Sequence, residues 1–140
     1  MDSQGALFGT ASTGGAAGSG VVFRLVPPTQ AGGAWTETVL HDFTGDRDGG
    51  APMAGLALMA NGQLVGTASK GGANQFGVVF RLTPPKTEGG AWNQKVLHSF
   101  TGIAEGGFPV AAPVVFKHAV FGVAEPTTPQ RVSDVFKLVP

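Results

Sequence analysis

Apolar residues along the chain fall in short runs that glycine and proline separate. Over windows of ten or more residues, no i, i+3, i+4, i+7 spacing of an amphipathic helix is sustained, and Gly or Pro interrupts nearly every such window. Four runs of strand length occupy the middle of the chain, at residues 55–59, 63–69, 77–83 and 92–100. The pattern predicts an all-β chain in which helices are almost absent.

The turn-forming residues between these runs predict that neighbouring strands are antiparallel. Asn61-Gly62 joins the first two runs, and both residue types tolerate the positive φ of a type I′ turn, so we expect a hairpin there. The double glycine at 71–72 marks the next turn. Pro84-Pro85 and Gly89-Gly90 bound the connection after it. Each set of four runs therefore predicts a small antiparallel sheet.

The same order of runs occurs more than once. Residues 5–52 align with residues 62–109 without a gap and share 30 identical residues in 48 positions. A third, weaker copy follows and matches the second in two short blocks, 121–124 with 65–68 and 135–138 with 79–82. This is an internal repeat.

Apolar side chains on both faces of the central runs indicate how the repeats are arranged. Val21-Val22-Phe23 and Val78-Val79-Phe80 place apolar groups on both pleat faces, whereas an exposed sheet alternates apolar with polar residues. Each sheet must therefore be covered on both sides. A four-stranded unit of about 57 residues, repeated head to tail, predicts β-propeller blades. A stacked β-solenoid is the alternative, but solenoid turns are usually shorter and need no hairpin within each repeat.

We expect a single repeat domain over residues 1–140, with repeats at about 5–52, 53–109 and 110–140. Strand counting gives about two and a half blades, whereas known propellers close with at least four. Three interpretations follow. The chain is a fragment of a longer protein, which we favour, or an open half-ring that self-associates through exposed terminal sheets, or a compact sheet assembly that is not a propeller.

Glycine and tryptophan recur at fixed places in the predicted strands. Gly66 and Gly122 interrupt strand-like runs and suit a close backbone approach or a bend in the sheet. Trp35 and Trp92 open the same strand in successive repeats. We expect both tryptophans to fill the seam between units.

Charge and composition exclude several classes of function. Nine Lys and Arg residues balance nine Asp and Glu residues, so the chain shows none of the basic character that nucleic-acid binding requires. The longest apolar stretches, such as residues 111–116, are too short to span a bilayer. The absence of Cys removes disulfides, zinc–thiolate sites and thiol catalysis. Residues 1–5 show no export signal.

The repeated blocks together resemble a known family. The segments LFGTASTGG, GVVFRLVPP and WTETVLHDFTG, with the DGG and Pro that follow, are similar to the tandem GloVer repeat of bacterial exported proteins. The resemblance covers residues 5–109 strongly and 110–140 weakly. It implies repeated β-sheets in a propeller and display outside the cell or on its surface, and it implies no catalytic residue or cofactor. Phe8 and Val65 stand where that family usually has Tyr.

Two histidines are the first candidates for chemistry. His41 and His98 occupy the same repeat position at the end of a predicted strand, where a pair of imidazoles could bind a metal or act as a base. Equivalent positions in successive blades are separated in angle, however. A structural hydrogen-bonding role is therefore the favoured interpretation.

An acidic loop is the second candidate. Asp46-Arg47-Asp48-Gly49 has oxygen donors two residues apart before a glycine, as part of a calcium loop would. Only Asp48 has an acidic counterpart in the next repeat, Glu105, and Asp46 is matched by Ile103. A plain acidic turn is therefore favoured over a metal site.

Glycine-rich and serine motifs do not indicate a nucleotide site or a hydrolase. Residues 9–20 lack the Gly-Lys-Ser/Thr ending and the following helix of a phosphate-binding loop. Ser12 and Ser69 have no His or Asp partner close in sequence. We therefore predict no catalytic, metal-binding or cofactor-binding residue.

Repeated polar residues favour an architectural function. Thr10 recurs as Thr67, whereas an enzyme would concentrate unrepeated polar residues on loops at its channel. Arg24 recurs as Arg81 and Lys137, either as a shared basic rim or as side chains that solvate one face of a strand. We predict a noncatalytic scaffold or recognition module that binds a protein or glycan. The alternative is a fragment of a propeller hydrolase or lyase with a channel-side active site.

Overall fold

The computed structural model describes residues 1–87, 89–103, 105–128 and 133–139, and within these ranges every regular element is a strand. Sheet 1 contains β1 (Leu7–Ala11), β2 (Val21–Val26) and β3 (Thr36–Asp42). Sheet 2 contains β4 (Ala57–Leu58), β5 (Leu64–Ala68), β6 (Val78–Thr83) and β7 (Asn93–Ser99). Sheet 3 contains β8 (Val114–Phe116), β9 (Ala119–Ala124) and β10 (Asp134–Leu138). The predicted all-β class is confirmed.

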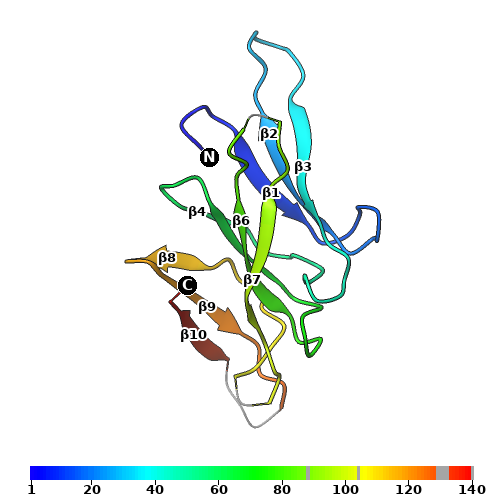
Figure 1. The fold of residues 1–140 in the computed structure, drawn as a ribbon, viewed down its shortest axis with the longest axis vertical. Coiled ribbons are helices and arrows are strands. Elements are labelled where there is room, and N and C mark those ends of the chain that lie inside the picture. Colours follow the sequence, from blue (N-terminus) through cyan, green and yellow to red (C-terminus); the bar gives the residue numbers. More distant parts are fainter. Residues whose placement is uncertain (88, 104, 129–132, 140) are drawn as a thin grey trace.

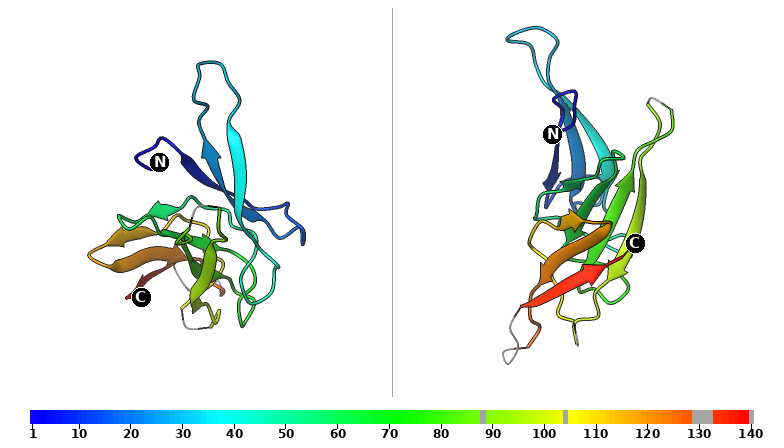
Figure 2. Two further views of the ribbon diagram at one scale, coloured as in Figure 1. Left: turned by 45° about the horizontal axis from the view of Figure 1, so that its top comes forward. Right: turned by 90° about the vertical axis from the view of Figure 1, so that its left-hand side faces the viewer.

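The three sheets are antiparallel and follow one another in chain order along the long axis of the molecule (Figure 1). Figure 2 shows sheet 1 standing at a steep angle to the other two sheets. The four runs predicted in the second repeat correspond to β4–β7, although β4 is shorter than its predicted run. Within the described residues none of these sheets closes on itself.

Sheets 1 and 2 share one hydrogen-bonding register, which the sequence identity of their repeats explains. In sheet 1, Gly9 is paired with Phe23, and in sheet 2 Gly66 is paired with Phe80. The β2–β3 and β6–β7 ladders each shift register at the valine that precedes this Phe. Sheet 3 repeats the pairing with Gly122 opposite Phe136.

The cross-strand phenylalanine covers the glycine in each sheet. A Cβ added to Gly66 would lie 2.5 Å from Phe80 Cζ, and one added to Gly122 would lie 2.3 Å from Phe136 Cζ. No side chain fits under the ring, so these strand positions require glycine. The predicted close approach at Gly66 and Gly122 is confirmed.

The hairpin at Asn61-Gly62 forms, but its predicted turn type is wrong. Gly62 has φ 79°, whereas Asn61 is not in the positive-φ region that a type I′ turn needs at both positions. The loop is one residue longer, since the Gly62 amide donates to Met59 O at 2.9 Å and the Met59 amide donates to Gln63 O at 2.8 Å. Asn61 Oδ1 instead accepts the Gln63 amide at 3.1 Å.

Two seams, each formed by a face of one sheet on the next, make up the core. Seam 1, between sheets 1 and 2, buries Val22, Leu40, Phe43, Leu64, Ala68, Val78, Phe80 and Leu82. Seam 2, between sheets 2 and 3, buries Val65, Val79, Phe100, Val120 and Ala124. In each seam a Phe at the end of one sheet packs edge-on against the ring that covers the next sheet's glycine, Phe43 on Phe80 and Phe100 on Phe136.

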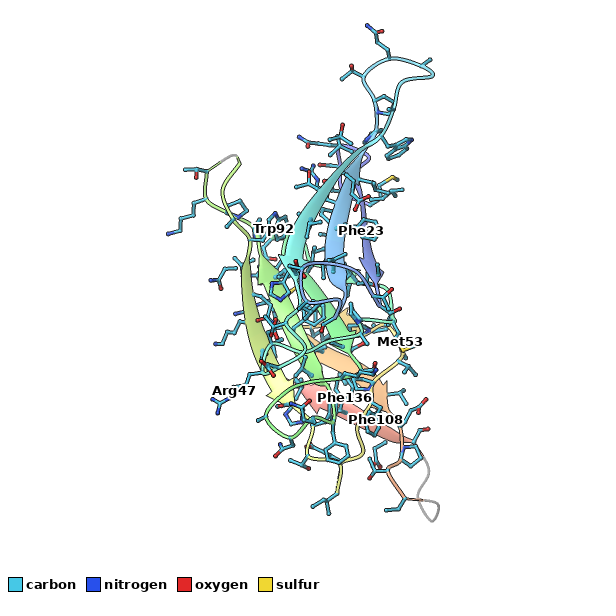
Figure 3. All side chains as sticks on the ribbon, turned by 90° about the vertical axis from the view of Figure 1, so that its right-hand side faces the viewer. Phe23, Arg47, Met53, Trp92, Phe108 and Phe136 are labelled. Atoms are coloured by element: carbon cyan, nitrogen blue, oxygen red, sulfur yellow. The ribbon has the colours of Figure 1, made fainter. Side chains whose placement is uncertain are left out.

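The tryptophans do not both fill a seam as predicted. Trp92 packs edge-on against Phe8 across seam 1, with 6.2 Å between ring centroids, and Figure 3 shows it beside sheet 1. Trp35 is 48% exposed, so the prediction for this residue is wrong. The reason is positional: Trp35 precedes β3 as Trp92 precedes β7, and no described sheet lies on the corresponding side of sheet 1.

Candidate functional site

The repeated threonines bind one sheet to the segment that leads into the next. Thr10 Oγ1 on β1 donates to Ala54 O at 2.9 Å, and Thr67 Oγ1 on β5 donates to Ala111 O at 3.1 Å. Donor and acceptor are separated by 44 residues in both cases. The two hydroxyl groups therefore hold successive repeats together and are not displayed to a substrate.

Paired backbone bridges reinforce the same junctions. Gly50 exchanges both amide bonds with Lys70, at 2.9 Å each, and Gly107 exchanges both with Glu125, at 2.9 and 2.7 Å. Ser69 adds a bond from its Oγ to Ala51 O at 2.9 Å. The segment after the last strand of one sheet is thus fixed to the hairpin turn of the next.

The two histidines each contact a carboxylate in the loop that follows their own strand. His98 Nε2 lies 2.9 Å from Glu105 Oε2 in a hydrogen bond, and His41 Nε2 lies 3.3 Å from Asp48 Oδ2 without hydrogen-bond geometry. The imidazole rings also pack edge-on against the phenylalanines two residues later, at 4.6 Å for His41 and 4.9 Å for His98. The structure keeps each histidine within its own repeat and does not join them in one site.

The same carboxylates close the loops by accepting backbone amides. Asp48 Oδ2 accepts the Thr44 amide at 2.9 Å, and Glu105 Oε1 accepts the Thr101 amide at 2.9 Å. Asp48 and Glu105, which the alignment paired, therefore have the same structural role. Each carboxylate accepts an amide four residues earlier and also contacts the histidine of its own repeat.

The pKa values of two of these groups are shifted. Burial lowers the pKa of His41 and outweighs the opposing charge of Asp48. Burial acts to raise the pKa of Glu105, but the Thr101 amide bond and the neighbouring His98 together hold it below its usual value. The loops are therefore best formed with the imidazole of His41 neutral and the Glu105 carboxylate ionised.

The acidic loop borders a hollow of about 570 Å³ that Asp46, Asp48 and Gly72 help to line. Asp46 contributes its carbonyl, which accepts the Gly72 amide at 2.7 Å, and Arg47 points into solvent (Figure 3). Across the described residues, no group of three or more His, Cys, Asp or Glu side chains could hold a metal ion. Among the observed bonds, the Asp48 carboxylate closes its own loop and the Asp46 carbonyl holds the turn of the next repeat.

The glycine-rich segment at 9–20 forms the end of β1 and the turn into β2. Gly14, Gly15, Gly18 and Gly20 all have positive φ, and the Gly20 amide donates to Gly14 O at 3.0 Å. The turn is fastened by the end of β3, where Asp42 Oδ2 accepts the Ala16 amide at 2.8 Å.

Ser99 Oγ accepts the Ala73 amide at 2.7 Å at the matching place in sheet 2. Sequence analysis did not identify Asp42 and Ser99, because they differ between the repeats. The sequence signal that could have identified them is that both side chains carry an oxygen that can accept a hydrogen bond.

The repeated cations lie across the strand from aromatic or apolar residues. Arg24 is paired with Phe8 and stands 5.9 Å from its ring centroid, while its guanidinium also contacts Asp2 at 3.1 Å. Lys137 is paired with Phe121 and lies 5.8 Å from that ring. Their side chains thus pack along a strand, as the second interpretation of these residues predicted.

A groove lies between sheet 1 and the loop before β7, where the sequence predicted no site. It has a volume of about 760 Å³ and is lined by Arg24 and Val39 on one side and by Pro84, Pro85, Lys86 and Trp92 on the other. Residues more than 40 positions apart in the sequence meet here, so no local sequence motif predicts this groove. Its mixed aromatic, proline and cationic lining has the composition of a binding groove.

A family model described as the Gloeobacter/Verrucomicrobia repeat matches residues 1–137. The chain belongs to this family. The match covers all three sheets, including the third repeat that sequence identity alone relates only weakly to the others. No curated protein and no solved structure matches this Gloeobacter/Verrucomicrobia repeat chain. In the ranges that the structure describes, no helix is long and apolar enough to cross a membrane.

Proposed function

We propose that the chain is a noncatalytic β-repeat module, a structural scaffold or recognition surface of an exported bacterial protein. The observation that carries this proposal is the use of the repeated polar residues. Thr10 and Thr67 join successive sheets, and His98 and Glu105 close a loop within one repeat. Polar groups with these partners stabilise the fold. The alternative, a fragment of a hydrolase or lyase, therefore has no candidate catalytic residue among them.

The sheets of this module are blades of a β-propeller in our proposal. Three features support it: each sheet is small and antiparallel, the sheets follow one another in chain order, and one seam repeats between them. Propeller blades are related in this way, with each sheet face covered by the next blade.

The groove lined by Arg24, Pro84 and Trp92 is the recognition surface that we propose. Trp92 offers a flat aromatic surface that can stack on a sugar ring or pack on a peptide side chain. Arg24 and Lys86 add hydrogen-bond donors at its border. The ligand class is therefore a glycan or a protein segment.

Binding of the purified chain to a glycan array and to a displayed peptide library tests this surface. We expect saturable binding that W92A abolishes and that the matched variant W35A retains, since Trp35 lies outside the groove. Circular dichroism of W92A checks that its loss of binding is a loss of recognition and not of the seam packing against Phe8. If no probe binds through Trp92, the proposed recognition surface is wrong. If mass spectrometry shows that the chain converts a bound glycan into a product, the noncatalytic assignment is wrong.

Localisation is tested in the bacterium that makes the protein. We expect protease added to intact cells to remove the chain, as detected with an antibody, while a cytosolic marker survives. Protection of the chain until the cells are lysed contradicts display at the surface.

A further inference from the structure

One face of sheet 1 exposes residues that are buried at the equivalent positions of sheet 2. Leu7 is 42% exposed and its equivalent Leu64 is 0% exposed. Phe23 is half-buried, whereas Phe80, which has the same cross-strand glycine, is completely buried. Val39, cross-strand from Phe23, is 52% exposed. The residue types are the same in both repeats, so the difference arises because none of the described sheets covers this face of sheet 1.

The outer face of sheet 3 presents the opposite half of the same seam. Val135 is 76% exposed, whereas Val79 at the same repeat position is 0% exposed because sheet 3 covers it. Val123 pairs with Val135 across the strand, and Val114 on β8 pairs with Phe121 on this same face. These positions form a continuous apolar face across the three strands of sheet 3.

The two exposed faces have complementary roles in the seams already present in the molecule. In seam 1 the covered face of sheet 1, through Val22, meets the face of sheet 2 that carries Leu64 and Phe80. In seam 2 Val79 meets the face of sheet 3 that carries Val120 and Phe136. Val135 is the sheet 3 equivalent of Val79. Leu7 and Phe23 are the sheet 1 equivalents of Leu64 and Phe80. The outer face of sheet 3 and the exposed face of sheet 1 are therefore the two halves of such a seam.

We propose that the chain associates head to tail with a second copy of itself, the outer face of sheet 3 of one copy covering the exposed face of sheet 1 of the other. Glu37 lies on the sheet 1 face beside Leu25, and Lys137 lies on the sheet 3 face beside Phe121, so the two faces carry opposite charges. This contact needs only the seam and not a closed ring of blades. Val39 lies on this face and also borders the groove, so the two proposals are distinguished by V135D, which changes the outer face of sheet 3 and no lining residue of the groove.

Apolar packing dominates this contact between copies. Val123 occupies the place from which Thr67 donates its hydrogen bond in seam 2, so that bond has no counterpart. The contact is heterologous, meaning that different faces of the two copies meet, and it can repeat or close into a ring.

Sedimentation velocity of the purified chain at micromolar concentration tests the proposal. We expect a mass that is a multiple of 14.2 kDa for the natural chain and a monomer for V39D and for V135D. Both valines are largely exposed within one copy, so these substitutions leave its fold intact, which circular dichroism checks. An equal mixture of the two variants should form a dimer that grows no further, because one sheet 1 face and one sheet 3 face remain intact.

Two results overturn the proposal: a natural chain that stays monomeric, or a mixture of V39D and V135D that stays monomeric while the natural chain associates. A disulfide test gives an independent measurement, since the chain has no Cys. Oxidation should cross-link a mixture of L7C and V135C into one heterodimer and leave each variant alone uncross-linked. Cross-linking of L7C with itself contradicts head-to-tail contact, because it places two sheet 1 faces together.

Discussion

Single atoms decide whether one repeat remains attached to the next, and the Thr67 hydroxyl is the clearest case. Its side chain is buried and its only observed acceptor among the described residues is Ala111 O. T67V keeps the shape of the side chain and removes the donor, so the hydrogen bond to Ala111 O is lost and this exposed carbonyl turns to water. We expect the free energy of unfolding to fall by about 0.5–1.5 kcal/mol in urea titrations, the net contribution of an ordinary hydrogen bond. T67S retains a hydroxyl and should recover most of this loss, whereas equal losses in T67V and T67S would exclude the hydrogen bond as the cause.

The glycines under the phenylalanine rings give a second prediction at this scale. In G66A the new methyl would meet Phe80 Cζ at 2.5 Å and Leu56 Cδ2 at 2.6 Å inside a filled seam. We expect a loss of about 1–3 kcal/mol, the usual range for overpacking a well-packed core. G9A is the matched control, since its methyl would meet Phe23 Cζ at the same 2.5 Å on the exposed face of sheet 1.

Phe23 has room to move away in G9A, so thermal unfolding should show a smaller loss than in G66A when both are measured below the concentration at which copies associate. Equal losses would contradict the open face of sheet 1.

Hairpins show how a turn selects its residues at the scale of whole elements. Lys117 and His118 connect β8 to β9 with φ values of 45° and 66°, so the type I′ turn occurs here and not at Asn61-Gly62. Residues with a Cβ are disfavoured in this left-handed region. K117N/H118G supplies the Asn-Gly pair typical of the turn and should raise the free energy of unfolding by about 1 kcal/mol. Thermal unfolding measures the gain, and K86N, a loop residue outside the positive-φ region, should leave stability unchanged.

Elements whose identity depends on local sequence were predictable, and those that depend on a neighbouring sheet were not. The strands β5–β7 follow from their apolar runs, and the repeat alignment identified Thr67 and Glu105 as counterparts of Thr10 and Asp48. The exposure of Trp35 could not be predicted in this way, because it depends on whether another sheet covers sheet 1, and none of the described sheets does so. The groove beside Trp92 could not be predicted either, since its two walls come from different repeats.

The whole molecule is held by two junctions that respond to acid in the same direction. The pKa of His41 is lowered in the folded state, so folding favours the neutral imidazole, and this contribution is lost as the pH falls from about 6.5 through the folded-state pKa. The pKa of Glu105 is also lowered, so its contribution is present above the ordinary value of 4.5 and is lost as the pH falls through the folded-state pKa. Acid therefore weakens the loop that leads to seam 1 first and the loop that leads to seam 2 second.

Urea midpoints measured between pH 7 and pH 3 should consequently decline in two stages. H41Q should remove the upper stage, because it leaves no group at that site to titrate. E105Q should reduce the lower stage without abolishing it, because the pKa of Asp2 is lowered too and this carboxylate still titrates in the acid range. H118Q, which alters an exposed histidine on the β8–β9 turn, should keep both stages. If H41Q retained the decline below pH 6.5, acid would act on seam 1 through a group other than this imidazole, and the histidine would be a packing residue whose protonation does not couple the sheets.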